Sequence, residues 1–228
     1  MAAQRVAGLA IAPVGSGESI RLWQELRPEA PVVALNGSAD GITGISRVSP
    51  DSTAAVELPM RRLAELGHTS VAFLSAPPAL MADPDRLRHF RRLARQLSLR
   101  PRVMYSLLTI ADVQRAAVTL LSSRDAPTAI ITNSDYTAHA VYKAARELSL
   151  PVGPGISVIG HDDLPTSELL DPPLATIRMD QRAMGRALMM RLLEPGPPDD
   201  YIAGVELIQR ASLQPPDMPR SGGAQRPR

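Results

Sequence analysis

The sequence predicts an α/β protein with parallel β-sheets covered by helices. Short apolar segments alternate with segments of helical periodicity along almost the whole chain, which is typical of βαβ units. Several short segments, such as residues 6–12 (VAGLAIA), are apolar throughout, as strands buried on both faces are. Of the 228 residues, 44% are hydrophobic and 21% are charged, a composition that indicates a folded chain rather than a disordered one.

Each expected element follows from a local pattern of apolar, capping and turn residues. The expected strands span residues 6–12, 31–36, 44–48, 70–74, 102–106, 127–132, 155–160, 176–179 and 205–209. The expected helices span residues 18–26, 52–66, 86–97, 111–122, 136–148 and 181–193. Pro59 should kink or split the second helix, which ends at Gly67. Residues 195–200 indicate a turn-rich hinge, and residues 215–228 a disordered tail rich in Pro, Gly and Arg.

Composition excludes several classes of protein. The chain has no cysteine, which excludes disulfide scaffolds, thiolate zinc sites and cysteine nucleophiles. Its longest apolar runs have the length of strands, far below the roughly 20 residues of a membrane span, and no secretory leader is evident. We therefore expect a soluble, cytoplasmic protein that does not bind membranes. The net charge is +2 and Lys143 is the only lysine, a balance that does not predict DNA binding by these residues.

Polar residues at the ends of strands are the first candidates for a site, because ligands of open α/β sheets bind beyond the carboxyl ends of the strands. Arg86 and Asp162 stand out among the polar residues. A guanidinium donates and a carboxylate accepts, so together they could hold the hydroxyls of a sugar or the polar edge of a nucleobase. The alternative for Arg86 is an ordinary solvent-facing arginine. The strand-end candidates are Asn36, Ser75, Ser134, Asp135, His161, Asp162 and Asp163.

Signals for other chemistry are weak. The chain has no G-x-S-x-G motif and no histidine with the neighbours of a triad, so we predict no enzyme, no catalytic residue and no cofactor. His161, Asp162 and Asp163 have the side chains of metal ligands, but adjacent residues of a strand point in different directions, and we predict no metal site. A polar strand end that faces water is the plain alternative. Residues 15–17 (GSG) lack the further residues of a phosphate loop, and a flexible helix entry is the better interpretation.

Several short motifs follow one another in a specific order. Asp51 lies sixteen residues before Gly67, and Arg86 opens a helix four residues before Phe90. Later motifs are residues 127–130 (PTAI), 134–135 (SD), 155–163 (GISVIGHDD), 172–176 (PPLAT) and 210–212 (RAS). Over about residues 4–214, this ordered set resembles the effector-binding core of the lactose/galactose repressor (LacI/GalR) family of bacterial transcription regulators.

The resemblance implies the periplasmic-binding-protein-like type I fold, in which three crossovers join two α/β lobes around a cleft. Residues 1–75 with 178–203 would then form an incomplete amino-terminal lobe, and residues 76–177 with 204–214 the carboxyl-terminal lobe. The first crossover is expected near Ser75. The helix-turn-helix headpiece, the hinge helix and the first part of the amino-terminal lobe are expected to be missing from these 228 residues.

The same resemblance implies a ligand site and partners. Arg86 and Asp162 would hold the ligand across the crevice between the lobes, with Asn36, Ser134 and Asp135 in support. His161 stands where relatives usually carry an aromatic ring. The ligand would be a small polar effector, a sugar or a nucleobase-like molecule; the chain would form a homodimer, and operator DNA would be bound only through the headpiece. The alternative is a sugar-binding protein of a transport system with the same fold.

Overall fold

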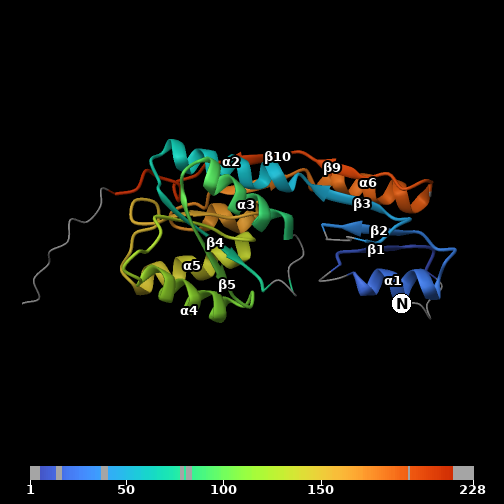
Figure 1. Ribbon diagram of the computed structural model, residues 1–228, viewed down its shortest axis with the longest axis horizontal. Helices are drawn as coiled ribbons and strands as arrows, with labels where there is room; N and C mark the ends of the chain where they lie inside the picture. Colours follow the sequence, from blue (N-terminus) through green and yellow to red (C-terminus); the bar gives the residue numbers. More distant parts are fainter. Residues whose placement is uncertain are drawn as a thin grey trace, which may run out of the picture.

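Two α/β lobes lie end to end along the longest axis of the molecule (Figure 1). They are seen in a computed structural model that describes residues 6–13, 17–36, 41–77, 80, 84–194 and 196–217. The first lobe has a parallel sheet in the order β1-β2-β3-β9, and the second lobe one in the order β5-β4-β6-β7. Both sheets are covered by helices, so the predicted fold class is confirmed.

The elements follow the expected order along the chain. The strands are β1 (Leu9–Ile11), β2 (Val32–Leu35), β3 (Ser46–Pro50), β4 (Ser70–Ser75), β5 (Arg100–Tyr105), β6 (Ala129–Ile131), β7 (Ser157–Ile159), β8 (Thr176–Met179), β9 (Tyr201–Ala203) and β10 (Val205–Ile208). The helices are α1 (Glu18–Leu26), α2 (Ser52–Glu65), α3 (Pro84–Gln96), α4 (Ile110–Leu121), α5 (Asp135–Glu147), α6 (Gln181–Leu193) and the 3-10 helix η2 (Pro165–Leu169). The strand β9 was not predicted.

Within the described part of the chain, no helix has both the length and the apolarity that a membrane crossing requires.

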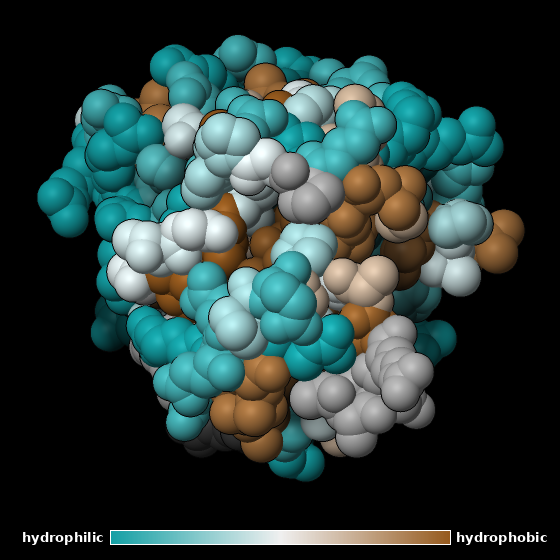
Figure 2. All heavy atoms as spheres, turned by 90° about the vertical axis from the view of Figure 1, so that its right-hand side faces the viewer, coloured by the Kyte–Doolittle hydropathy of each residue, from teal (hydrophilic) through white to brown (hydrophobic). Residues whose placement is uncertain are grey.

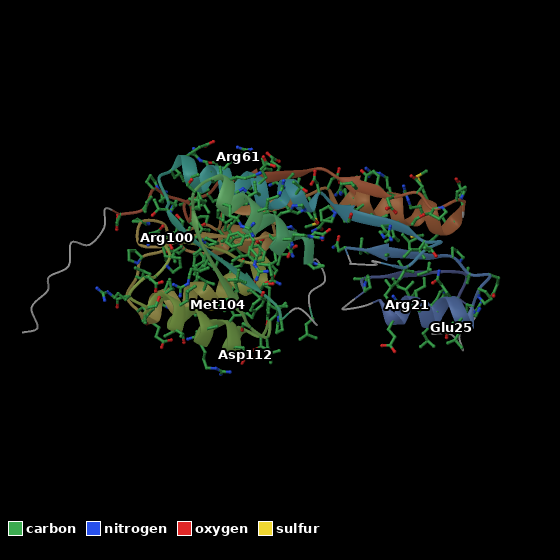
Figure 3. All side chains as sticks on the ribbon, viewed as in Figure 1. Arg21, Glu25, Arg61, Arg100, Met104 and Asp112 are labelled. Carbon is green, nitrogen blue, oxygen red and sulfur yellow. The ribbon has the colours of Figure 1, made fainter. Side chains whose placement is uncertain are left out.

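The first lobe buries the two faces of its sheet under different helices. Ile20 and Trp23 of α1 pack against Val32 and neighbouring residues on one face. Val33, the next residue of β2, points to the other face and packs with α6, as the alternation of side chains along a strand requires. The exposed part of α1 carries Arg21 and Glu25 (Figure 3) together with the exposed Leu22 and Leu26. Amphipathic α1 therefore needs only one sheet face to bury its apolar stripe.

The second lobe repeats this plan with a larger core. Phe73 of β4 packs on α2 and α3, and its ring lies 5.3 Å from that of Phe90, measured between centroids. The neighbouring Leu74 points to the opposite face and packs on α4 and α5. Strands buried on both faces read as continuous apolar runs, which is why residues 70–74 were recognisable as a strand.

Pro59 does not split α2, contrary to the expectation. The helix is continuous from Ser52 to Glu65, and Pro59 is buried within it. The Asp51 side chain accepts hydrogen bonds from the backbone N–H groups of Thr53 and Ala54, both at 2.9 Å, which stabilises the first turn. Burial of one helix face, including Met60, outweighs the single backbone hydrogen bond that proline removes.

The expected division between the lobes at residue 75 is wrong. Strand β4, which was assigned to the first lobe, is hydrogen-bonded to β5 and β6 of the second sheet. Helix α2 packs against α3 and β10. The first crossover is therefore the link from β3 to α2 near Asp51, not Ser75. The other two crossovers are the link from β8 to α6 and the link from β9 to β10.

The last described residues of the chain, up to Asp217, are hydrogen-bonded to the second lobe. The backbone N–H of Asp217 donates to the carbonyl of Pro154 at 3.2 Å. The carbonyl of Gln214 accepts from the His68 ring, with Nε2 at 2.9 Å, and from the Ser157 hydroxyl at 2.9 Å. The expectation of a disordered tail is therefore wrong for residues 215–217, and residues 218–228 lie outside the described residues.

Alanine substitutions at two glycines are expected to have opposite effects on the free energy of unfolding. A Cβ atom at Gly160, directly after β7, would overlap the buried carboxylate of Asp135, whereas no described atom lies within 4 Å of a Cβ at Gly185 in α6. We expect Gly160→Ala to destabilise the protein by about 3 kcal/mol and Gly185→Ala to stabilise it by about 0.5–1 kcal/mol. Urea unfolding of the two variants measures both changes. Equal free energies of unfolding would contradict this account of Gly160.

Candidate functional site

The predicted ligand residues of the second lobe gather at the carboxyl edge of its sheet. Arg86 lies in the first turns of α3, which follows β4, and its Nη1 donates to the carbonyl of Asn133, after β6, at 3.2 Å. Ser134 follows Asn133, while His161 and Asp162 follow β7. Because β4, β6 and β7 are parallel neighbours, their carboxyl ends share one edge, and the side chains that follow them converge there.

His161 and Asp162 form a hydrogen-bonded pair at this edge. The His161 Nδ1 lies 3.0 Å from Asp162 Oδ1. The side chain of Asp162 is 32% exposed, whereas that of His161 is only 8% exposed. Asp162 has φ 121° and Asp163 has φ 53°, a left-handed region that aspartate tolerates better than most residues. The backbone turn thus leaves the Asp162 carboxylate partly open to solvent and buries the ring beside it.

Burial and charge keep the His161 ring neutral. Burial is the largest influence on the pKa of His161, and the positive charge of Arg86 adds to it, so the pKa lies below the usual 6.5. The hydrogen bond to Asp162 and the charge of Asp135 oppose this shift without reversing it. Arg86 reaches the carbonyl of Asn133 after β6, the strand next to β7, and so lies at the same sheet edge as the His161–Asp162 pair. Arg86, His161 and Asp162 therefore form one cluster of a donor, a neutral ring and an acceptor.

Asn36 is the predicted site residue that belongs to the first lobe. It directly follows β2, has φ 54°, and donates its backbone N–H to the carbonyl of Val48 at 3.0 Å. Its Oδ1 is buried and has no hydrogen-bond partner among the described residues. Arg86 and Asp162 both belong to the second lobe, and their binding of a ligand in the crevice stays a prediction.

Asp135 is not a ligand residue, contrary to the prediction. It is fully buried, and both of its carboxylate oxygens serve the fold. Oδ2 accepts from the backbone N–H of Leu164 at 2.8 Å and from the Ser167 hydroxyl at 2.6 Å, while Oδ1 accepts from the Thr176 hydroxyl at 2.6 Å. The carboxylate thus joins α5 to η2 and β8, and it has no surface to offer to a ligand.

Ser134 lies at the predicted edge but serves mainly as a helix cap. Its hydroxyl accepts from the backbone N–H of Thr137 at 3.3 Å and lies 3.2 Å from the Thr137 hydroxyl, as an N-cap serine does. The side chain is half-buried. Ligand binding by Ser134 stays a prediction.

Next to Asp162 lies a cavity of about 580 Å³. Its lining comes from the β7 loop and from the two crossovers formed by β8 with α6 and by β9 with β10: Asp162, Asp163, Arg178, Met179, Asp180, Gln181, Arg182, Gly204, Val205 and Glu206. Asp162 is the predicted ligand residue among those that line this cavity. The site therefore borders the links that set the relative position of the lobes.

Asp163 is a residue whose role the sequence did not reveal. Its carboxylate accepts from Arg178 Nε at 2.6 Å and from Arg210 Nη2 at 2.8 Å. Burial alone would raise the pKa of Asp163, but these two guanidinium groups lower it below its usual value. Arg178 lies in β8, and Arg210 follows β10. Asp163 thus connects the loop that carries Asp162 to two crossovers. In the sequence, the only signal for this role was that Asp163 directly follows Asp162.

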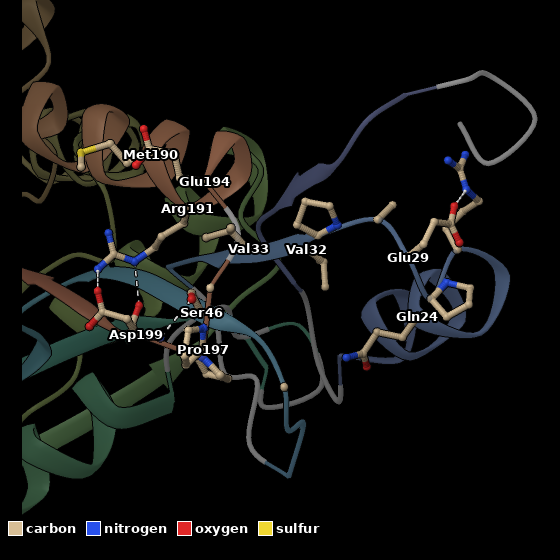
Figure 4. A pocket seen from close by; sticks show the side chains of 17 residues that line it. Gln24, Glu29, Val32, Val33, Ser46, Met190, Arg191, Glu194, Pro197 and Asp199 are labelled. Atoms are coloured by element: carbon tan, nitrogen blue, oxygen red, sulfur yellow. Dashed lines mark hydrogen bonds and ion pairs between the residues drawn. The ribbon is translucent and has the colours of Figure 1, made fainter.

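A second cavity, of about 420 Å³, lies at the opposite end of the first sheet (Figure 4). It is lined by residues at the amino ends of β2 and β3, such as Val32 and Ser46, and by the end of α6, where Arg191 Nη2 bonds Asp199 at 2.6 Å. This end of the molecule shows hydrophobic patches between hydrophilic ones (Figure 2). None of the predicted ligand residues lines it.

Metal and phosphate sites have no support from the described residues. Within the described ranges, no three His, Asp or Glu residues are placed to share a metal ion. Gly17 has φ 70° at the start of α1, and residues 14–16 lie outside the described residues. The predicted ligand residues offer a hydrogen-bond donor in Arg86 and acceptor oxygens in Asp162 and Asn36.

Comparisons with known proteins bear on this arrangement. The family of periplasmic binding protein-like domains matches residues 60–213. The HTH-type transcriptional regulator MalR of Streptomyces coelicolor is 34% identical over 203 residues, which cover 83% of this chain and 58% of that protein. The dimeric Lac repressor with an 11-residue C-terminal deletion is similar with a TM-score of 0.82 at 26% identity, over 94% of this chain and 80% of that chain.

A LacI family regulator from Enterococcus faecium, solved with bound ribose, is similar with a TM-score of 0.80 at 20% identity. The match covers 94% of this chain and 82% of that chain, and it shows the shared fold. The chain spans just over half the length of the curated regulators that it matches.

Proposed function

The chain belongs to the LacI/GalR family of transcriptional regulators, as an effector-binding core of periplasmic-binding-protein-like fold, and from this premise we propose that it binds a sugar as its effector. The sugar lies between the carboxyl edge of the second sheet and the first lobe. The observation that carries the proposal is that Arg86, His161 and Asp162 lie together at this edge, with Arg86 bonded to the Asn133 carbonyl and His161 to Asp162. MalR of Streptomyces coelicolor is a transcriptional regulator and the relative from Escherichia coli is the lactose operon repressor, which does not favour a transport protein.

The chemistry of the cluster suits hydroxyl groups. A sugar hydroxyl both donates and accepts, so one hydroxyl accepts from the Arg86 guanidinium while its neighbours donate to the Asp162 carboxylate. Asp162 is 32% exposed and reaches the adjoining cavity, which leaves its oxygens accessible. The bound ribose of the Enterococcus faecium regulator supports a sugar as the class of ligand.

In a regulator, the effector acts by shifting the population of lobe arrangements. A ligand shifts such an equilibrium only by its differential affinity for the two states. The site borders the crossovers, where Asp163 joins Arg178 and Arg210, so a ligand at Asp162 acts on the links between the lobes. The operator DNA is bound by a helix-turn-helix headpiece of a homodimer, whose two-fold symmetry matches two half-sites.

A thermal-shift screen of the 228-residue chain tests this function. The panel holds D-ribose, D-glucose and maltose, with adenine and hypoxanthine to represent nucleobases. We expect one of the sugars to raise the melting temperature by roughly 5–10 °C at 100 times its Kd, because binding to the folded state alone adds about 2.7 kcal/mol. A shift by a nucleobase and by none of the sugars would contradict a sugar effector, and no shift at all would contradict effector binding by this chain.

A further inference from the structure

The ring of His161 is a buried polar group beside Asp162, at the sheet edge where the proposed site lies. His161 is 6% exposed and follows the buried strand β7. One ring nitrogen, Nδ1, is bonded to Asp162 Oδ1 at 3.0 Å. The other, Nε2, is buried and has no hydrogen-bond partner among the residues that the structure describes. The unused nitrogen therefore needs an explanation, because buried polar atoms of proteins are almost always paired.

The hydrogen bond to Asp162 decides which nitrogen carries the proton. A carboxylate only accepts, so Nδ1 of His161 must donate. Of the charged groups that face the ring, Arg86 lowers the pKa of His161, in the same direction as burial, while Asp162 and Asp135 raise it; the net shift is downward. A neutral ring with its proton on Nδ1 leaves a lone pair on Nε2. His161 Nε2 is therefore a hydrogen-bond acceptor.

A buried acceptor without a partner costs free energy in the ligand-free protein, and a donor from a ligand recovers that cost. The first lobe offers a similar atom, since Asn36 Oδ1 is also buried without a partner in the described part of the chain. The Asp162 carboxylate is a third acceptor. Hydroxyl groups can donate to all three, whereas the ionised oxygens of a carboxylate or a phosphate cannot.

We propose that His161 Nε2 accepts a hydrogen bond from a hydroxyl group of the bound effector and thereby selects a neutral sugar over a sugar acid or a sugar phosphate. This assignment rests on the function proposed above. In the bound state Arg86 donates to the sugar, Asp162 accepts from it, and His161 both holds Asp162 through Nδ1–H and accepts through Nε2. His161 is thus a specificity-determining residue.

The test uses the 228-residue chain and its His161→Phe variant, which keeps a ring but removes the acceptor. Calorimetry compares D-ribose with D-ribose 5-phosphate and D-glucose with D-glucuronate. We expect the wild type to bind the neutral member of a pair, and His161→Phe to bind it about tenfold more weakly, the value of one hydrogen bond. His139→Phe, on α5 and half-buried, is the control and should leave the affinity unchanged.

The pH dependence of sugar binding distinguishes the loss of a hydrogen-bond acceptor from the loss of packing. Protonation of His161 converts Nε2 from an acceptor into a donor, so the affinity of the wild type should fall between pH 7.5 and a pH below the pKa of the ring, which burial holds below its usual 6.5. The loss approaches tenfold per pH unit below the pKa of the ring. His161→Phe should show no such loss, because it has no titrating group at this position.

Nuclear magnetic resonance of ¹⁵N-labelled histidine reads the tautomer without any ligand. We expect the signal that is lost in His161→Phe to show a protonated Nδ1 and a bare Nε2 at pH 7. A proton on Nε2 in the free chain would overturn the assignment. Equal binding of a neutral sugar by wild type and His161→Phe at both pH values would overturn it too, while the proposed function stands. No binding of any sugar would overturn the proposed function and the assignment together.

Discussion

Asp162→Asn should abolish most effector binding while leaving the protein folded. Hydrogen bonds to a charged group are worth about 1.5–3 kcal/mol each, so the loss of two from a sugar corresponds to roughly 100-fold weaker binding or more. Asparagine is the appropriate replacement because Asp162 has φ 121°, a region in which asparagine is accepted and alanine is strained. Calorimetry with the sugar found in the screen measures the affinity, and thermal unfolding confirms the fold.

A matched control separates the site from a general effect of lost charge. Asp125 pairs with Arg102 on the surface, and its side chain is 65% exposed. Asp125→Asn removes the same charge, and we expect it to change neither the affinity nor the melting temperature. If Asp162→Asn binds the sugar as tightly as the wild type, Asp162 is not a ligand residue.

Asp135→Ala should destabilise the protein more than substitution of Asp125 or Asp162 does. It would leave the Leu164 N–H and the hydroxyls of Ser167 and Thr176 without their acceptor, and both hydroxyl residues are fully buried. Each orphaned buried group costs about 1–3 kcal/mol, so we expect a loss of about 3 kcal/mol or more. For a chain of this size that lowers the melting temperature by roughly 10 °C.

Two further variants make this prediction decisive. Asp135→Asn retains the shape and one acceptor oxygen, so it should lose less stability than Asp135→Ala. The exposed Asp125→Ala should change the free energy of unfolding by less than about 0.5 kcal/mol. If Asp135→Ala is no less stable than Asp125→Ala, the hydrogen bonds of Asp135 do not support the fold. The three chains are compared by urea unfolding at pH 7.

Most elements could be predicted because their signal is local. Residues 52–66 and 181–193 were expected as helices and form α2 and α6, and the apolar run at 70–74 forms β4. The strand β9 escaped prediction because it has three residues and follows a stretch rich in proline. It forms by pairing with β3, a partner some 150 residues away in the chain.

The division into lobes failed for a related reason. The apolar pattern of residues 70–75 shows that they form a strand buried on both faces, but nothing in that pattern says which sheet the strand joins. Hydrogen bonds to β5 and β6 decide this. The first crossover consequently lies near Asp51 instead of Ser75.

Asp135 and Asp162 show most clearly which properties of a side chain cannot be predicted from the sequence. The fold class, the family resemblance and the sheet edge at which both aspartates lie follow from the sequence alone, because alternating periodicity and strand ends are properties of short segments. The folded arrangement shows that hydroxyls of η2 and β8 enclose the carboxylate of Asp135, while that of Asp162 stays partly open beside His161. The direction of a side chain depends on neighbours from distant segments of the chain, and the adjacent residues in the sequence do not identify those neighbours.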